Sequence, residues 1–151
     1  MVDIATRYCI LDTLPDKSSD TVVQATIKVF SDYGFPLYIC SDNSTEFVNT
    51  LMEKLTKASG STHIRSTPYH PQGNSVAERY VQTVINIIRK NVQGATHDCD
   101  LYVKPAQLAL NNKVAGTHGS TPFTLMFNRT MNGFNDYTKN SIPRQMTEEE
   151  L

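Results

Sequence analysis

The chain has 151 residues and a formal net charge of −1 at neutral pH, and 39% of its residues are hydrophobic. These values fit one soluble globular domain with a real core, and they give no global electrostatic case for nucleic-acid binding. No apolar run is long enough to cross a bilayer, and the first residues do not form a signal peptide. The three cysteines form no CxxC pair, so we expect reduced intracellular thiols rather than disulfides or a zinc site.

Strand and helix patterns alternate along the first two thirds of the chain. In order, the sequence predicts extended structure over 2–12 with a turn near 5–7, a helix over 18–33, a strand over 37–40, a helix from a capping box at 43–46 to Gly60, and a strand over 61–67. A Pro/Gly loop and mostly helical patterns follow, with helices over 76–91, 101–112 and 121–127. We therefore expect one α/β domain over residues 1–130 and a polar tail over 131–151.

Two carboxylates occupy positions typical of a functional site. Asp42 follows a predicted strand, and ligand sites of open α/β sheets lie at the carboxyl ends of strands. Asp42 could instead cap the next helix. Glu78 fits a capping box that starts at Ser75. Helical phase nevertheless places Glu78 at the border of the apolar face of its helix, with Arg89 on the same border.

The spacing of these carboxylates and the motifs around them resemble a known family. Asp42 and Glu78 are separated by 35 residues, and SDNSTEF followed by STPYHPQGNSVAER resembles the catalytic core of retroviral and gypsy-class retrotransposon integrases. The later segment LYVKPAQLALNNKVAGTHGSTPFTLMFNR is similar to the helix pair that ends this core. It departs from the usual pattern at Asn128, where glycine is common, and in having no tryptophan. The resemblance covers roughly residues 2–130.

The resemblance implies an RNase H-like mixed sheet flanked by helices, and DNA integration by metal-dependent polynucleotidyl transfer. Asp42 and Glu78 would be catalytic residues that bind Mg²⁺ or Mn²⁺, with two ions in the complete site. DNA would be contacted by residues of the loop and of the helix that follows it: His70, Gln72, Asn74, Arg79, Arg89 and Lys90. His70 could equally order the loop, and Arg79 could be a solvated helix charge. Residues 63–90 hold four basic residues against one acidic residue, which is a weak signal for DNA.

The family uses a third carboxylate, for which Asp3 is the obvious candidate. We expect that Asp3 is not the catalytic residue, because VDIATRY resembles the second strand of the family's opening hairpin, whereas the catalytic aspartate lies on the first. The sheet would then lack its first, central strand, which would leave buried edges unpaired. On this interpretation the chain is an incomplete fragment of an integrase, truncated at its amino terminus, and whether it is an enzyme by itself stays open.

Two alternatives remain beside the integrase interpretation. The chain could be an RNase H-like nuclease or a transposase, although the HPQGNSVAER string argues against both. It could also be a non-catalytic, domesticated remnant that acts as an interaction module. The resemblance further implies a homo-multimer on paired DNA ends, no membrane, and action in the nucleus of a eukaryotic host.

Overall fold

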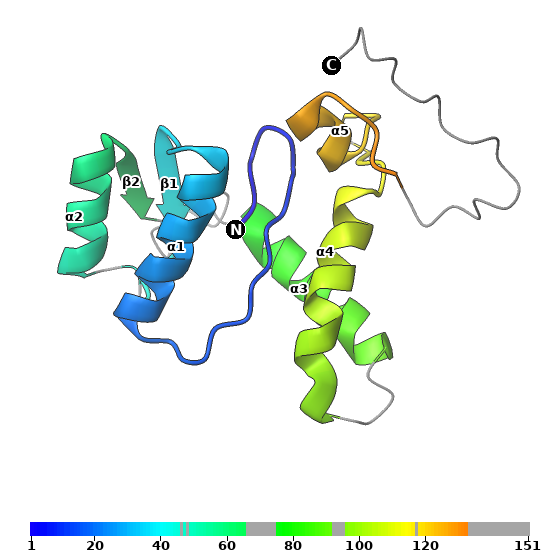
Figure 1. Cartoon of the computed structure of the whole chain (residues 1–151), viewed down its shortest axis with the longest axis horizontal. Helices are drawn as coiled ribbons and strands as arrows, with labels where there is room; N and C mark the ends of the chain where they lie inside the picture. The colour runs from blue at the N-terminus through cyan, green and yellow to red at the C-terminus, as the bar shows by residue number, and fades with distance from the viewer. Residues whose placement is uncertain (46, 48, 66–74, 92–95, 117, 133–151) are drawn as a thin grey trace, which may run out of the picture.

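The computed structural model describes residues 1–45, 47, 49–65, 75–91, 96–116 and 118–132. The elements are α1 Ser19–Tyr33, β1 Tyr38–Ser41, α2 Thr50–Ser59, β2 Thr62–Arg65, α3 Ser75–Asn91, a 3-10 helix η1 Thr96–Tyr102, α4 Val103–Asn111 and α5 Pro122–Phe127. Figure 1 shows two halves, one with α1, α2 and both strands and the other with α3, α4 and α5. The amino-terminal segment runs between them. This succession of elements confirms the predicted α/β class.

Helix α1 forms where its capping and apolar pattern predict it. The side chain of Ser18 accepts a hydrogen bond from the amide three residues on, which satisfies one of the unpaired donors of the first turn. Gly34 ends the helix with φ of 86°, a conformation that favours glycine. A helical period of 3.6 residues places Ile27 and Tyr33 on the same face as the buried residues, yet they are 43% and 37% exposed. The buried face consists of Val22, Val23, Thr26 and Phe30.

The two strands form a parallel pair; β1 is shifted by one residue from the predicted 37–40, and β2 lies within the predicted 61–67, of which residues 66 and 67 lie outside the described residues. Ile39 lies opposite His63, and Ser41 lies opposite Arg65. Side chains alternate between the two faces of a strand, and in β1 Ile39 and Ser41 are buried whereas the other two residues are exposed. Consequently Ile39, Ser41 and His63 share the inward face of the pair.

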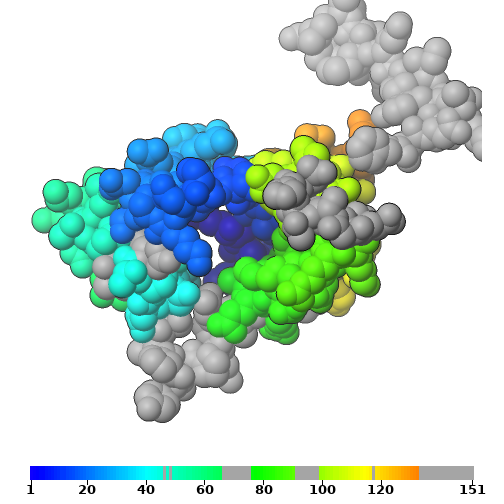
Figure 2. All heavy atoms as spheres, turned by 90° about the horizontal axis from the view of Figure 1, so that it is seen from below, coloured from blue at the N-terminus to red at the C-terminus, as the bar shows by residue number. Residues whose placement is uncertain are grey.

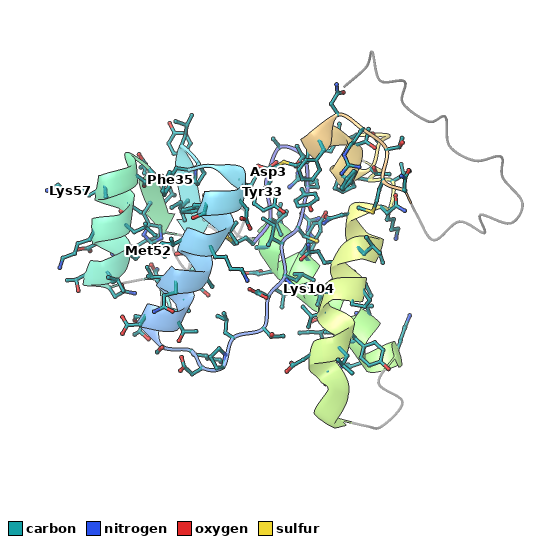
Figure 3. All side chains as sticks on the ribbon, viewed as in Figure 1. Asp3, Tyr33, Phe35, Met52, Lys57 and Lys104 are labelled. Carbon is teal, nitrogen blue, oxygen red and sulfur yellow. The ribbon has the colours of Figure 1, made fainter. Side chains whose placement is uncertain are left out.

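Helix α2 corrects one prediction. It begins at Thr50, and its N-cap is Asn49, whose side chain accepts a hydrogen bond from the amide of Met52. The predicted capping box at 43–46 is therefore wrong, because the chain makes a turn after β1 before the helix starts. Met52 is only 1% exposed, and Figure 3 shows it on the side of α2 that faces α1.

The second half is helical, as predicted. Pro105 lies in the first turn of α4, where its missing amide costs little. The side chain of Thr121 caps α5 by accepting from the amide of Thr124, and Pro122 follows in the first turn. Asn128 ends α5 in the left-handed conformation, with φ of 53°. Asparagine tolerates this conformation better than most residues, which explains how it stands where the resemblance expects glycine.

The amino-terminal segment is a hairpin-like loop rather than a long strand. Val2 and Cys9 form an isolated antiparallel bridge, and the amide of Asp3 donates to the carbonyl of Tyr8. Arg7 turns the chain with φ of 64°. This confirms the turn predicted near 5–7. Within the described ranges, no backbone hydrogen bond joins this loop to β1.

Contacts of this segment hold the two halves together. The ring of Tyr8 lies 5.9 Å from that of Tyr33 on α1 and 5.3 Å from that of Phe127 on α5, between ring centroids. Asp12 forms ion pairs with Lys28 on α1 at 3.7 Å and with Lys104 on α4 at 3.2 Å. Figure 3 shows Lys104 beside this segment. The arrangement of the halves therefore depends on residues 8–12.

Most of the expected polar tail, residues 133–151, lies outside the described residues. None of the helices in the described ranges is both long enough and apolar enough to cross a membrane.

Candidate active site

Asp42 lies at the carboxyl end of β1, directly after the last residue of the strand, and is exposed to solvent. Its Oδ1 accepts hydrogen bonds from the amide of Ser44 at 3.1 Å and from the Ser44 hydroxyl at 2.7 Å. These bonds form a tight turn of the kind that aspartate side chains favour. Asp42 is therefore not the cap of the next helix, a role that Asn49 fills.

Directly behind Asp42, a buried serine and a half-buried histidine connect the strands. Ser41 is 7% exposed, and its Oγ donates a hydrogen bond to the backbone carbonyl oxygen of Asp42 at 2.8 Å. The same Oγ lies 2.8 Å from Nε2 of His63 on β2. The backbone of Asp42 is thus held from the interior of the sheet, while its carboxylate faces solvent.

The charges around His63 favour its neutral form. Burial lowers the pKa of His63, the positive charge of Arg65 lowers it further, and Glu53 acts in the opposite direction. Arg65 pairs with Glu53 at 3.2 Å across the end of β2 and α2. A neutral imidazole suits this position, because Nδ1 of His63 is buried and has no hydrogen-bond partner among the described residues.

Glu78 and Arg79 are exposed in the first turn of α3. Figure 1 shows that α3 begins on the side of the β-sheet half and then runs away from it, and the view in Figure 2 agrees. Asp42 follows the last residue of β1, and Glu78 lies in the first turn of α3. The described part of the chain nevertheless contains no group of three or more His, Cys, Asp or Glu side chains that could hold a metal ion.

The apolar face of α3 is less covered than its periodicity predicts. Val81 is 58% exposed and Ile85 is 36% exposed. Glu78 is one turn before them on a helix whose side chains are at most half-buried. Glu78 was predicted at the border of the apolar face of its helix. Because this face is only partly covered, Glu78 lies at an exposed helix start and not beside a packed core.

Arg89 and Lys90 are exposed in the last turn of α3, well away from the carboxylates. Arg89 lies eleven positions after Glu78, which corresponds to about 16 Å along a helix at 1.5 Å per residue. Positive charges at this end also interact favourably with the helix dipole. The structure thus places these two residues at the opposite end of α3 from Glu78. The other expected DNA contacts, His70, Gln72 and Asn74, lie outside the described residues.

Asp3 has a structural role in its own turn. Its Oδ2 accepts hydrogen bonds from the amide of Thr6 at 2.8 Å and from the hydroxyl of Thr6 at 2.5 Å. Figure 3 shows Asp3 on the amino-terminal loop, apart from β1 and β2. Asp42 makes the same kind of turn with Ser44, so the role of Asp3 in the site stays a prediction.

Comparison with known proteins shows which proteins the chain resembles. The model of the integrase core domain matches residues 1–71. The retrovirus-related Pol polyprotein from transposon 412 of Drosophila melanogaster is 29% identical over 128 residues, which are 84% of this chain and 10% of that protein. The chain is therefore similar to integrase cores of the retrotransposon and retroviral type. A gypsy retrotransposon integrase-like protein 1 from Bos taurus is 26% identical over 129 residues, 85% of this chain and 26% of that protein.

Solved structures confirm the fold of the chain. The HTLV-2 integrase catalytic core domain in complex with magnesium, in a trimeric form, aligns with a TM-score of 0.69 at 19% identity. The alignment covers 83% of this chain and 80% of that one. The RNase H-like α/β fold predicted from the sequence is therefore confirmed. The chain spans about a tenth of the length of the transposon 412 polyprotein.

Sequence reasoning did not identify Ser41 and His63 as part of the site. His63 stands on a predicted strand and Ser41 directly after one, and their side chains meet only because the strands pair in parallel with one particular register. The available signal was weak: a serine directly before Asp42 and a histidine on the next strand.

Proposed function

We propose that this chain is part of an integrase catalytic core that acts on DNA by metal-dependent polynucleotidyl transfer, namely 3'-end processing and strand transfer. Asp42 and Glu78 would be its catalytic, metal-binding residues. The observation that carries the proposal is the exposed carboxylate of Asp42 at the carboxyl end of β1, anchored from behind by Ser41. Ligand sites of α/β sheets lie at such strand ends.

The chemistry of the available donors suits Mg²⁺ or Mn²⁺. Both ions prefer carboxylate oxygens, and Asp42 and Glu78 offer them from exposed positions. Bound ions would activate the attacking oxygen and stabilise the leaving oxygen of the phosphodiester. Asp42 and Glu78 would supply two ligands of this site. We do not assign Asp3 as the third ligand, because VDIATRY resembles the second strand of the family's opening hairpin and the catalytic aspartate lies on the first.

The proposed DNA contacts divide into two regions. Arg79 stands next to Glu78, and the proposed contacts of the preceding loop, His70, Gln72 and Asn74, would lie close to the reacting phosphodiester. Arg89 and Lys90, about 16 Å further along α3, would meet phosphates about five nucleotides away at 3.4 Å per nucleotide. Such contacts position a duplex without reading its sequence.

Assembly and location are further parts of the proposal. Solved relatives include trimeric and dimeric forms of the HTLV-2 core, and we propose a homo-multimer for the parent integrase. Integration implies action in the nucleus of a eukaryotic host.

Metal binding by the chain provides the first test. Mn²⁺ titrated into ¹⁵N-labelled protein should broaden the amide signals of Asp42, Asn43 and the first turn of α3 before others, because the paramagnetic ion acts over short distances. Asp42→Asn and Glu78→Gln should each weaken this broadening. Asp32→Asn, which removes an exposed carboxylate at the end of α1, is the matched control. Equal broadening in the wild type and in both site variants would exclude Asp42 and Glu78 as ligands.

The second test concerns catalysis by the chain as it stands. If Asp3 is not the third carboxylate, we expect the chain to lack strand transfer on its own, as a non-catalytic module would. We expect no Mg²⁺-dependent joining of element-end DNA above the level of Asp42→Asn. Robust joining that Asp3→Asn abolishes would show instead that Asp3 completes the site. Cleavage of an RNA–DNA hybrid without end joining would favour the nuclease alternative.

A further inference from the structure

The link between Ser41 and His63 has a defined direction, which follows from the number of protons available. The Ser41 hydroxyl carries one hydrogen, and its oxygen lies 2.8 Å from two partners, the carbonyl oxygen of Asp42 and Nε2 of His63. A carbonyl can only accept, so the hydroxyl hydrogen points to Asp42. The second contact is then a hydrogen bond only if Nε2 of His63 carries the proton and donates to the serine oxygen.

The surroundings of His63 support this neutral Nε2–H tautomer. With Nε2 protonated, the buried Nδ1 is a bare acceptor, and no partner for it lies among the described residues. A proton on Nδ1 would create a buried donor without an acceptor, which costs more than a missing bond to an acceptor. The lowered pKa of His63, due first to burial and then to Arg65, agrees with the neutral ring.

The chain of bonds ends on the main chain of Asp42. Ser41 holds the carbonyl that starts the peptide between Asp42 and Asn43, and Ser44 holds Oδ1 of the Asp42 side chain. Rotation of that peptide would move the backbone of residues 43 and 44 and so disturb the turn that orients the carboxylate. The buried pair therefore restricts the direction of an exposed side chain.

We infer that Ser41 and His63 are positioning residues for Asp42, and that His63 on β2 fixes the Asp42 peptide through the Ser41 hydroxyl. The fixing of the Asp42 peptide rests on the hydrogen bonds alone, whereas its consequence for metal binding rests on the proposed function. Hydrogen-bonded groups behind a metal ligand typically affect metal affinity by about 10- to 100-fold.

Four variants separate this role from simple packing. Ser41→Ala removes the link, and Ser41→Thr retains the hydroxyl on a strand-forming residue. His63→Leu removes the donor, and His63→Gln retains an N–H near the position of Nε2. Ser31→Ala and His118→Leu are the matched controls, since both residues are exposed and lie outside the strand pair.

Amide hydrogen exchange of Ser44 gives a readout that needs no metal. In the wild type this amide donates to Asp42 Oδ1, so its exchange reports the turn directly. We expect Ser41→Ala and His63→Leu to accelerate it about fivefold, as loss of roughly 1 kcal/mol of hydrogen bonding implies. Ser41→Thr, His63→Gln and both controls should stay near the wild-type rate, as should the amides of α1 in every variant. Unchanged Ser44 exchange in Ser41→Ala and His63→Leu would overturn the inference.

Mn²⁺ broadening then tests the functional consequence. Ser41→Ala and His63→Leu should need about tenfold more Mn²⁺ for the same broadening at Asp42. The double variant should be no weaker than Ser41→Ala, because His63 acts through Ser41. If the effects of the two single variants on Mn²⁺ binding add up in the double variant, His63 does not act through Ser41. If Ser44 exchange responds as expected but Asp42→Asn binds Mn²⁺ like the wild type, the proposed function fails and the positioning role stands. If Ser44 exchange is unchanged but Asp42→Asn weakens Mn²⁺ binding, the positioning role fails and the proposed function stands.

Discussion

The side chain of Asn111 pairs with both backbone groups of Cys9, although 102 residues separate them. The Cys9 amide donates to Oδ1 of Asn111 at 2.8 Å, and Nδ2 of Asn111 donates to the Cys9 carbonyl at 2.8 Å. Both residues are almost completely buried, with exposed fractions of 1% and 0%. The primary amide thus takes the place of a neighbouring strand and attaches the amino-terminal loop to α4.

Replacement of Asn111 should be strongly destabilising. Asn111→Ala leaves the amide and the carbonyl of Cys9 buried without partners, at a cost of about 1–3 kcal/mol for each unsatisfied group. We expect the free energy of unfolding to fall by at least about 2 kcal/mol in urea denaturation. Asn86→Ala, at an exposed position of α3, should change it by less than about 0.5 kcal/mol. Similar values for the two variants would show that the pairing contributes little.

Asp3 should matter for stability and not for metal binding. Asp3→Ala removes two exposed hydrogen bonds to Thr6, so we expect a loss of about 1 kcal/mol in the free energy of unfolding. The Mn²⁺ concentration that broadens Asp42 should stay the same. A clear rise in that concentration, with the fold retained by circular dichroism, would make Asp3 a metal ligand.

The cysteines should differ in reactivity. Burial raises the pKa of Cys9 to about 11, despite the opposing charge of the amino terminus, and the thiol is completely buried. Since the thiolate is the reactive form, only about one Cys9 in a thousand would be ionised at pH 8. Cys40 is exposed on β1. Iodoacetamide at pH 8 followed by peptide mass mapping should therefore modify Cys40 well before Cys9, and equal rates would indicate that the amino-terminal loop opens readily.

Stability should fall in mild acid because of His63. Its pKa in the folded chain is lowered from the ordinary value of 6.5, so the unfolded chain binds a proton more readily. The contribution of neutral His63 is therefore complete above pH 6.5 and is lost as the pH falls through and below that value. The loss of unfolding free energy between pH 7.5 and pH 5.5 should be smaller in His63→Gln than in the wild type. Identical pH profiles in urea denaturation would assign the change to other groups.

Local signals in the sequence were sufficient for most of the secondary structure. Helix α1 and helix α5 begin and end where their caps predict, because each cap is a hydrogen bond between residues only three apart. The same reasoning failed for α2, where Asn43 and Glu46 have capping-box spacing but the helix starts seven residues after Asn43. Two acceptable caps, Asn43 and Asn49, stand close together there, and packing of Met52 selects the second.

The sequence by itself determined the resemblance to integrase cores, the α/β order and the position of Asp42 at a strand end, since each depends on residues near one another in the chain. Only the tertiary structure decided what lies behind Asp42 and what anchors the amino-terminal loop. The contact of Ser41 with His63 depends on strand register, and that of Asn111 with Cys9 on how α4 packs. A buried hydrogen bond is favourable only when both partners are buried together. Which partners meet depends on how segments far apart in the chain pack, and a local sequence pattern does not show this.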